Sequence, residues 1–246
     1  MNTNTAKKSN IGNQSLGKVN KPSLLLFLTE MPRAFYSFML GYIFYKKTKP
    51  INEIKDHPVL VIPGFMGTDT STMLLRRYLK KKGFQVSGWE LGRNLANLKD
   101  IKRIQEKVNE LYDFYQKPVI LIGWSLGGVY ARHITKNNPR KTAQLITLGS
   151  PYMGVSEPNR AHLTFRLVKW GRGFNDHERK WISSLPQPIE VPSTAIYSKL
   201  DGIVSWKVCH EAHCGIQHNN IEVTCGHFGM GTSKDVFEAL DKIILS

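Results

Sequence analysis

Ser125 lies between two glycines at the end of an apolar run, and this stretch is the part of the sequence best suited to chemistry. Residues 118–122 read Pro-Val-Ile-Leu-Ile, without polar alternation, which predicts a strand covered on both faces. Apolar residues then recur at helical spacing, so a sharp turn must join this strand to a helix. Glycine at positions 123 and 127 allows that turn and a strained serine backbone. The G-x-S-x-G pattern predicts a nucleophile elbow with Ser125 as the nucleophile.

Two later residues could activate this serine. A serine hydroxyl is a weak nucleophile, so it needs a base within hydrogen-bond reach and an acid that orients the base. In chains with this strand and helix pattern, the acid follows the serine and the histidine comes last. Asp201 follows an expected strand over residues 193–198, and His227 follows one over residues 221–225. We predict that Asp201 and His227 complete a triad with the serine, with His218 as the second choice for the base.

Acyl transfer also needs an oxyanion hole, a pair of backbone N–H donors aimed at the oxygen of the tetrahedral intermediate. One donor is expected from Leu126, directly after the nucleophile. The other is expected from the loop after a strand over residues 59–62, where Gly64 lets the chain pass close to the site. We select Phe65, with Met66 as the second choice. The alternative interpretation of this loop is an ordinary turn that ends the strand.

A second cluster near the end of the chain combines cysteine and histidine: Cys209, His210, His213, Cys214 and Cys225. Their spacing matches no usual zinc pattern, and a metal near His227 would compete for the base. We therefore expect neither a metal nor another cofactor, with zinc as the alternative. Three cysteines are too few for a disulfide scaffold, although a single bond between Cys209 and Cys225 is an alternative.

Strand and helix patterns alternate from residue 57 onward. The expected strands cover residues 59–62, 84–91, 119–122, 143–149, 193–198 and 221–225. Helices are expected near residues 70–82, 101–115 with Asp100 as the cap, from 126, and from 233. This alternation predicts the α/β class, with a doubly wound, mostly parallel sheet and helices on both faces.

The same patterns divide the chain into three parts. Residues 1–20 are polar and are expected to be a disordered tail. Residues 21–48 form an N-terminal apolar helical segment, and residues 49–246 form one domain. The alternation lapses after the strand that ends near residue 149, so residues 152–188 are expected to be a lid-like insertion.

The apolar segment over residues 22–45 could contact a membrane without crossing it. Glu30, Pro32 and Arg33 would lie near the bilayer centre in a spanning helix, where charges are costly. A signal peptide is disfavoured because the apolar run is short and no cleavage site follows. We expect two short helices broken at Pro32 and packed on the domain, with peripheral contact to a membrane as the alternative. Residues 1–50 carry eight basic residues and one acidic residue, which favours anionic lipid.

The net charge of +15 would also suit nucleic acid, but the basic residues are scattered and no nucleic-acid-binding motif is present. We therefore expect no nucleic-acid partner. The expected location is cytoplasmic, with membrane association as the alternative.

Five segments together resemble the α/β-hydrolase superfamily, closest to bacterial triacylglycerol-lipase-like esterases. They are Pro63-Gly-Phe-Met-Gly-Thr-Asp69, Gly123-Trp-Ser-Leu-Gly127, Thr147-Leu-Gly-Ser-Pro151, Asp201-Gly-Ile-Val204 and Gly226-His227. The resemblance covers residues 57–246 and implies a carboxylic ester hydrolase that forms an acyl-serine intermediate. It also implies a lid over an apolar acyl pocket, at the position of residues 152–188. Many lipases have His-Gly where this chain has Pro63-Gly64.

This resemblance sets the functional expectation. The substrate is expected to be a small-molecule or lipid ester, cleaved by a serine hydrolase with Ser125, Asp201 and His227 as its triad. Two alternatives stay open: an acyltransferase that uses the same triad, and a non-catalytic lipid-binding protein of the same fold.

Overall fold

The structure is a computed structural model that describes residues 19–53, 55, 57–154, 175–211 and 218–244. Almost all of the tail expected over residues 1–20, and most of the insertion expected over 152–188, lie outside the described residues.

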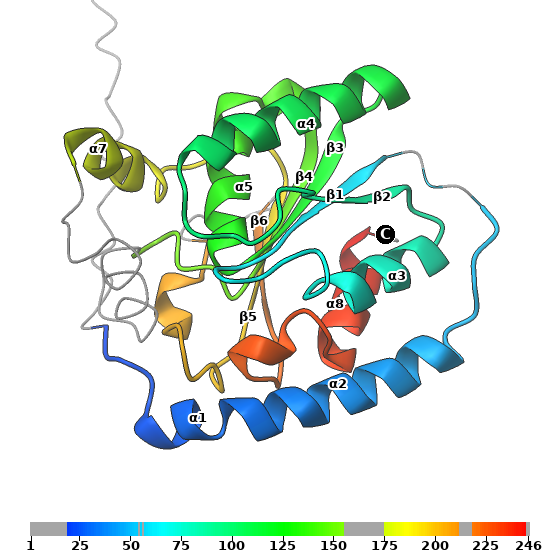
Figure 1. The fold of residues 1–246 in the computed structure, drawn as a ribbon, viewed down its shortest axis with the longest axis vertical. Coiled ribbons are helices and arrows are strands. Elements are labelled where there is room, and N and C mark those ends of the chain that lie inside the picture. Colours follow the sequence, from blue (N-terminus) through cyan, green and yellow to red (C-terminus); the bar gives the residue numbers. More distant parts are fainter. Residues whose placement is uncertain (1–18, 54, 56, 155–174, 212–217, 245–246) are drawn as a thin grey trace, which may run out of the picture.

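A single sheet of six parallel strands forms the centre of the described chain (Figure 1). The strands are β1 (Val59–Ile62), β2 (Val86–Gly88), β3 (Val119–Trp124), β4 (Thr142–Leu148), β5 (Ser193–Tyr197) and β6 (His218–Glu222). Their order is β2-β1-β3-β4-β5-β6, and every neighbouring pair is parallel. The predicted α/β class and parallel sheet are confirmed.

Helices cover both faces of this sheet. The longer elements are α3 (Met73–Lys81) and α8 (Lys234–Ile244) on one face, and α4 (Lys99–Tyr115) and α5 (Leu126–Asn137) on the other. The remaining elements are α1 (Leu24–Leu28), α2 (Glu30–Lys47), α7 (Asp176–Ser184) and the short 3-10 helices η1 (Pro139–Lys141), η2 (Trp206–Val208) and η3 (His227–Gly229).

Successive residues of a central strand pack on opposite faces, as the period of two requires. In β1, Val59 and Val61 join the core with α3 and α8, whereas Leu60 and Ile62 join the core with α4 and α5. All four are fully buried. The uninterrupted apolar run in this strand therefore reflects two buried faces.

The last strand begins and ends earlier than predicted. It covers His218–Glu222 and not residues 221–225, because β6 pairs along the whole of β5, with Ser193 opposite His218 and Tyr197 opposite Glu222. The expectation that His218 precedes this strand is wrong, since it is the first strand residue. The chain then leaves the sheet, and Thr224 bonds the Asp235 carboxylate at 2.7 Å.

Two helix boundaries also differ from the predictions. Asp100 is not the cap of α4 but lies in its first turn. The positive end of the helix dipole still stabilises a carboxylate at this position. The break in the N-terminal segment lies at Thr29 and not at Pro32. Pro32 is tolerated because it lies in the first turn of α2, whose N–H groups have no intrahelical acceptor.

Helices α1 and α2 form a long arm along one side of the rest of the protein (Figure 1). Helix α2 contacts η3, α8 and α3. Of the helices that the structure describes, none combines the length and apolar character needed to cross a bilayer.

Candidate active site

The chain turns sharply at Ser125, where β3 ends and α5 begins. The Ser125 backbone has φ 53° and ψ −119°, in the left-handed half of conformational space that costs energy for a non-glycine residue. A Cβ at position 123 would lie 2.3 Å from the Gly128 Cα, and one at position 127 would lie 2.3 Å from the Ile62 oxygen. Both positions therefore require glycine, as the sequence pattern indicated.

Of the three residues predicted to form the triad, His227 lies within hydrogen-bond distance of both Ser125 and Asp201. His227 Nε2 lies 3.0 Å from Ser125 Oγ, and His227 Nδ1 lies 2.7 Å from Asp201 Oδ2. The side chains come from the ends of β3 and β5 and from η3 after β6. All three residues are buried, with exposed fractions of 4–8%. With the proton on Nδ1, as the Asp201 contact favours, the Nε2 lone pair faces the serine hydroxyl.

The Asp201 carboxylate is held by its own loop. Its Oδ1 accepts hydrogen bonds from the backbone N–H groups of Ile203 at 2.8 Å and Val204 at 2.7 Å. Its Oδ2 is left for the imidazole of His227. A carboxylate with both oxygens engaged has a fixed orientation, so it fixes the orientation of the histidine as well.

Opposing influences act on the pKa of His227. Burial favours the neutral imidazole and lowers the pKa, whereas the charge and the hydrogen bond of Asp201, together with the charge of Glu30, raise it. The net result is a pKa raised above its ordinary value. His227 is therefore a stronger base than a free histidine.

The loop after β1 passes directly beside the serine. A Cβ at Gly64 would lie 3.1 Å from Ser125 Cβ and 3.8 Å from its Oγ. Among the hydrogen bonds between described residues, none has the N–H of Phe65 or Leu126 as its donor. The N–H of Met66, by contrast, donates to the Asn94 oxygen at 2.8 Å. Phe65 and Leu126 thus keep a donor each, whereas that of Met66 is already used.

Asn94 fixes this loop, a role that sequence reasoning missed. Its side-chain nitrogen donates to the Pro63 oxygen at 2.9 Å, and its backbone N–H donates to the Gly67 oxygen at 2.9 Å. Together with the hydrogen bond from Met66, these bonds hold both ends of the loop against Asn94, which is fully buried. Only the position of Asn94 after an expected strand could have drawn attention to it.

Glu30 is the second residue that sequence reasoning missed. Its buried carboxylate accepts from the backbone N–H groups of Gly202 at 2.7 Å, His227 at 3.0 Å and Phe228 at 3.3 Å. Arg33 also donates to it, at 3.0 Å. The available signal was that Glu30 is the one acidic residue among the first fifty. Within residues 22–45, however, Glu30 was expected only to oppose membrane insertion.

The alternative candidates take other places. His218 Nδ1 lies 2.8 Å from Ser193 Oγ, between β5 and β6. Cys209 and Cys225 are both buried and free, so the disulfide alternative is wrong. His213 and Cys214 lie outside the described residues; within the described part, no three metal-binding side chains gather.

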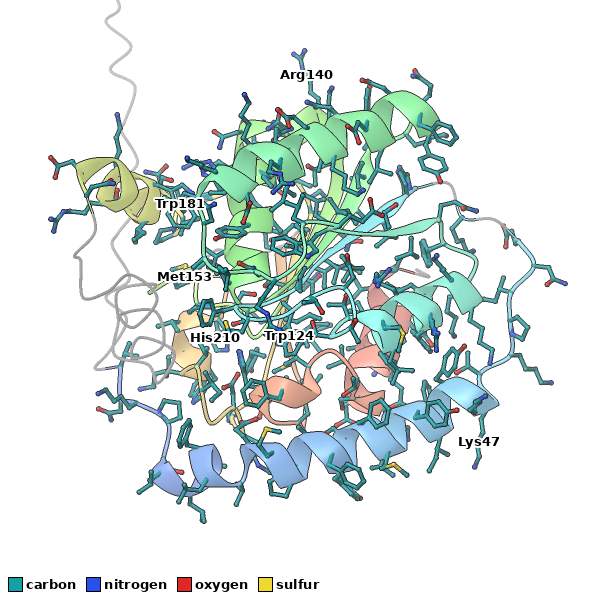
Figure 2. The ribbon with its side chains drawn as sticks, in the orientation of Figure 1. Lys47, Trp124, Arg140, Met153, Trp181 and His210 are labelled. Carbon is teal, nitrogen blue, oxygen red and sulfur yellow. The ribbon has the colours of Figure 1, made fainter. Side chains whose placement is uncertain are left out.

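Residues 175–188, a described part of the segment that was expected to be a lid-like insertion, lie on the α5 side of the sheet. Trp181 of α7 packs on Tyr130 and His133, with ring centroids 6.3 Å and 5.9 Å apart. A groove of about 530 Å³ runs between α4, α5 and α7, and no predicted triad residue lines it. Figure 2 shows Trp181 and Trp124, which precedes the serine, in separate parts of the molecule.

Solved structures of several hydrolases share this fold. The structure of the metagenome-derived lipolytic enzymes LipS and LipT gives a TM-score of 0.58 at 14% identity, over 80% of this chain and 96% of that chain. The mature Bacillus licheniformis lipase BlEst2 gives 0.57 at 14% identity, over 80% and 96%. The thioesterase domain from the curacin biosynthetic pathway gives 0.53 at 16% identity, over 78% and 92%.

No family model and no curated protein sequence matches the chain. At these identities the structural matches establish the fold alone, and the three matched proteins named above are hydrolases. The chain thus has the α/β-hydrolase fold, with a structure similar to bacterial lipases and esterases and to thioesterases.

Proposed function

We propose that the chain is a serine hydrolase that cleaves a carboxylic ester through an acyl-serine intermediate. The observation that carries the proposal is the hydrogen-bonded chain from Ser125 Oγ through His227 to Asp201, placed at a strained turn before a helix. These three groups have the geometry that nucleophilic catalysis requires.

The reaction follows from the roles of these groups. Ser125 Oγ attacks the ester carbonyl carbon while His227 Nε2 takes its proton, and Asp201 stabilises the resulting imidazolium. The N–H groups of Phe65 and Leu126 stabilise the negative oxygen of the tetrahedral intermediate. His227 then returns the proton to the leaving alcohol. Water, deprotonated by the same histidine, hydrolyses the acyl-serine and releases the carboxylic acid.

We further propose an apolar acyl ester as the substrate. The support is the likeness to proteins named as lipases and lipolytic enzymes, together with the aromatic composition of residues 152–188. A series of p-nitrophenyl esters of increasing acyl length measures this preference. A rise in kcat/KM with acyl length is expected, and a preference for acetate over all longer chains would contradict it.

The test of the triad is replacement of its nucleophile. Ser125→Ala should lower kcat on a p-nitrophenyl ester by about 10⁴-fold or more, because no other group supplies the attacking oxygen. Ser183→Ala, which changes an exposed serine of α7, is the matched control and should keep wild-type activity. Unchanged turnover in folded Ser125→Ala would end the proposal. If the acyl group passes to an added alcohol in preference to water, the same triad serves an acyltransferase.

A further inference from the structure

The buried and exposed faces of α2 are the reverse of an ordinary surface helix. Its buried residues are small or polar, namely Glu30, Ser37 and Gly41. Its outward side and α1 carry large apolar side chains, including Leu25, Leu28, Met31, Phe35, Met39 and Ile43. Figure 2 shows side chains of α1 and α2 pointing away from the rest of the protein along the whole arm. Of the large apolar side chains exposed among the described residues, twelve of eighteen lie within residues 24–43.

Charged residues are confined to the inner side and the two ends of this arm. Within residues 22–45 only Glu30 and Arg33 are charged, and they bond each other and the loops beneath. Exposed lysines flank the apolar stretch, at positions 21, 46, 47 and 49. Lys47 marks the C-terminal end of the arm in Figure 2. A continuous apolar face with a basic boundary is typical of a helix that lies in the plane of an anionic membrane surface.

We propose that the outer face of α1 and α2 binds the surface of a bilayer that contains anionic lipid. The apolar side chains would enter the acyl region, and the flanking lysines would contact lipid phosphates. A second copy of the chain fits this face less well, because the lysines at the two ends of the arm would bring like charges together, and Glu30, the one acidic residue within residues 21–49, is buried.

The site proposed above lies directly behind this surface. A Cβ at Gly202 would lie 2.5 Å from the backbone of Leu26, so the loop of Asp201 touches α1. A Cβ at Gly229 would lie 2.9 Å from Ser37 Oγ, so the loop of His227 touches α2. Binding of the arm to a bilayer would therefore bring both loops close to the lipid.

Co-sedimentation of the full chain with vesicles tests the surface. We expect it to pellet with phosphatidylglycerol–phosphatidylcholine vesicles and to bind phosphatidylcholine vesicles more weakly, with added salt weakening the anionic binding. The double variant Leu25→Gln/Phe35→Gln changes residues that are 71% and 68% exposed. Its binding to the anionic vesicles should be weaker by about tenfold or more. Its thermal melting without lipid should match the wild type.

Phe114→Gln is the matched control, because Phe114 is 79% exposed but lies on α4, away from the arm. It should bind as the wild type does. Ser125→Ala should also bind normally, so failure of the proposed reaction would leave this test intact. Equal binding by the folded double variant, or no binding by the wild type, would overturn the proposal. If the wild type forms a dimer, the double variant does not, and the wild type does not bind vesicles, the face would belong to a second copy of the chain. That result would also overturn the proposal.

A separate observation concerns the inner side of the same arm. One carboxylate, Glu30, bonds the residue after Asp201 and the backbone of His227 itself. The two triad loops are far apart in sequence and meet at this side chain. We infer, on the basis of the function proposed above, that Glu30 is a positioning residue, which sets the separation of Asp201 and His227 without touching the substrate.

The pH profile of Glu30→Gln separates this role from simple loss of stability. The variant loses the charge and part of the acceptor capacity, so kcat/KM should fall by about tenfold or more. The charged groups that face His227 from the elements packed on it are Asp201 and Glu30, with Arg33 beside Glu30. Since Glu30 raises the pKa of His227, its loss should move the acidic limb of the profile to lower pH.

Two further variants separate the effect of the Glu30 charge from other effects of substitution. Arg33→Gln leaves the carboxylate but removes its cation, so the acidic limb should move to higher pH. Glu53→Gln makes the same chemical change as Glu30→Gln at a side chain that is 74% exposed, and the limb should stay in place. A Glu30→Gln enzyme with wild-type kcat/KM per folded molecule, or with an unmoved limb, would overturn the inference.

Discussion

Helices α8 and α2 contact each other, yet opposite residue patterns hold them in place. Helix α8 buries apolar residues such as Val236 and Phe237 against the sheet, as the hydrophobic effect predicts. Helix α2 buries Glu30, Ser37 and Gly41 and leaves most of its large side chains outside, while Phe44 and Tyr45 near its C-terminal end are partly buried against the core. Apolar burial therefore fixes α8, whereas along most of its length α2 is fixed by close backbone approach and a buried carboxylate.

The largest effect is expected from Phe237→Ala in α8. Phe237 is fully buried and stacks on Tyr78 with ring centroids 4.3 Å apart, so truncation leaves a cavity in the core. We expect the free energy of unfolding to fall by about 3–5 kcal/mol, measured by urea denaturation. A loss below about 1 kcal/mol would contradict the assignment of α8 as a core helix.

A smaller effect is expected from Gly41→Ala in α2. The added Cβ would lie 1.7 Å from the Thr232 carbonyl oxygen, and a backbone atom cannot move aside as a side chain can. The free energy of unfolding should fall by about 1–3 kcal/mol. At an open helix position, the same change stabilises by up to about 1 kcal/mol. The sign alone, read from thermal melting, therefore decides whether α2 packs closely here.

The smallest effect is expected from Phe35→Ala, the counterpart of Phe237→Ala on the outer side of α2. Because Phe35 is already largely exposed, the free energy of unfolding without lipid should change by less than about 0.5 kcal/mol. The urea experiment used for Phe237→Ala measures it under the same conditions. A loss comparable with that of Phe237→Ala would show that the outer side is covered by protein.

The sheet and the triad geometry were accessible from sequence because each depends on short-range patterns. The apolar run before Ser125 and the glycines around it specify a buried strand and a close turn within a few residues. Asp201 and His227 each follow a strand, and parallel strands bring such loops to one edge of a sheet. Their assigned catalytic roles stay predictions.

The contributions of Glu30 and Asn94 could not be found in the same way. Each acts by accepting or donating bonds with backbone groups of distant loops, and such contacts leave no periodic trace in a sequence. The start of β6 was missed for a related reason. His218 and its neighbours are polar and form an edge strand, whose position depends on pairing with β5 and not on burial.

Covalent labelling by a fluorophosphonate tests the central claim most directly, because the probe reports on an activated serine without assuming any substrate. The wild-type chain should gain one phosphonyl group per molecule, located on Ser125 by peptide mass spectrometry. Ser125→Ala should gain none, and His227→Ala should react far more slowly because the base is lost. A folded wild-type chain that stays unlabelled, or a label on another serine, would contradict the assignment of Ser125 as the nucleophile.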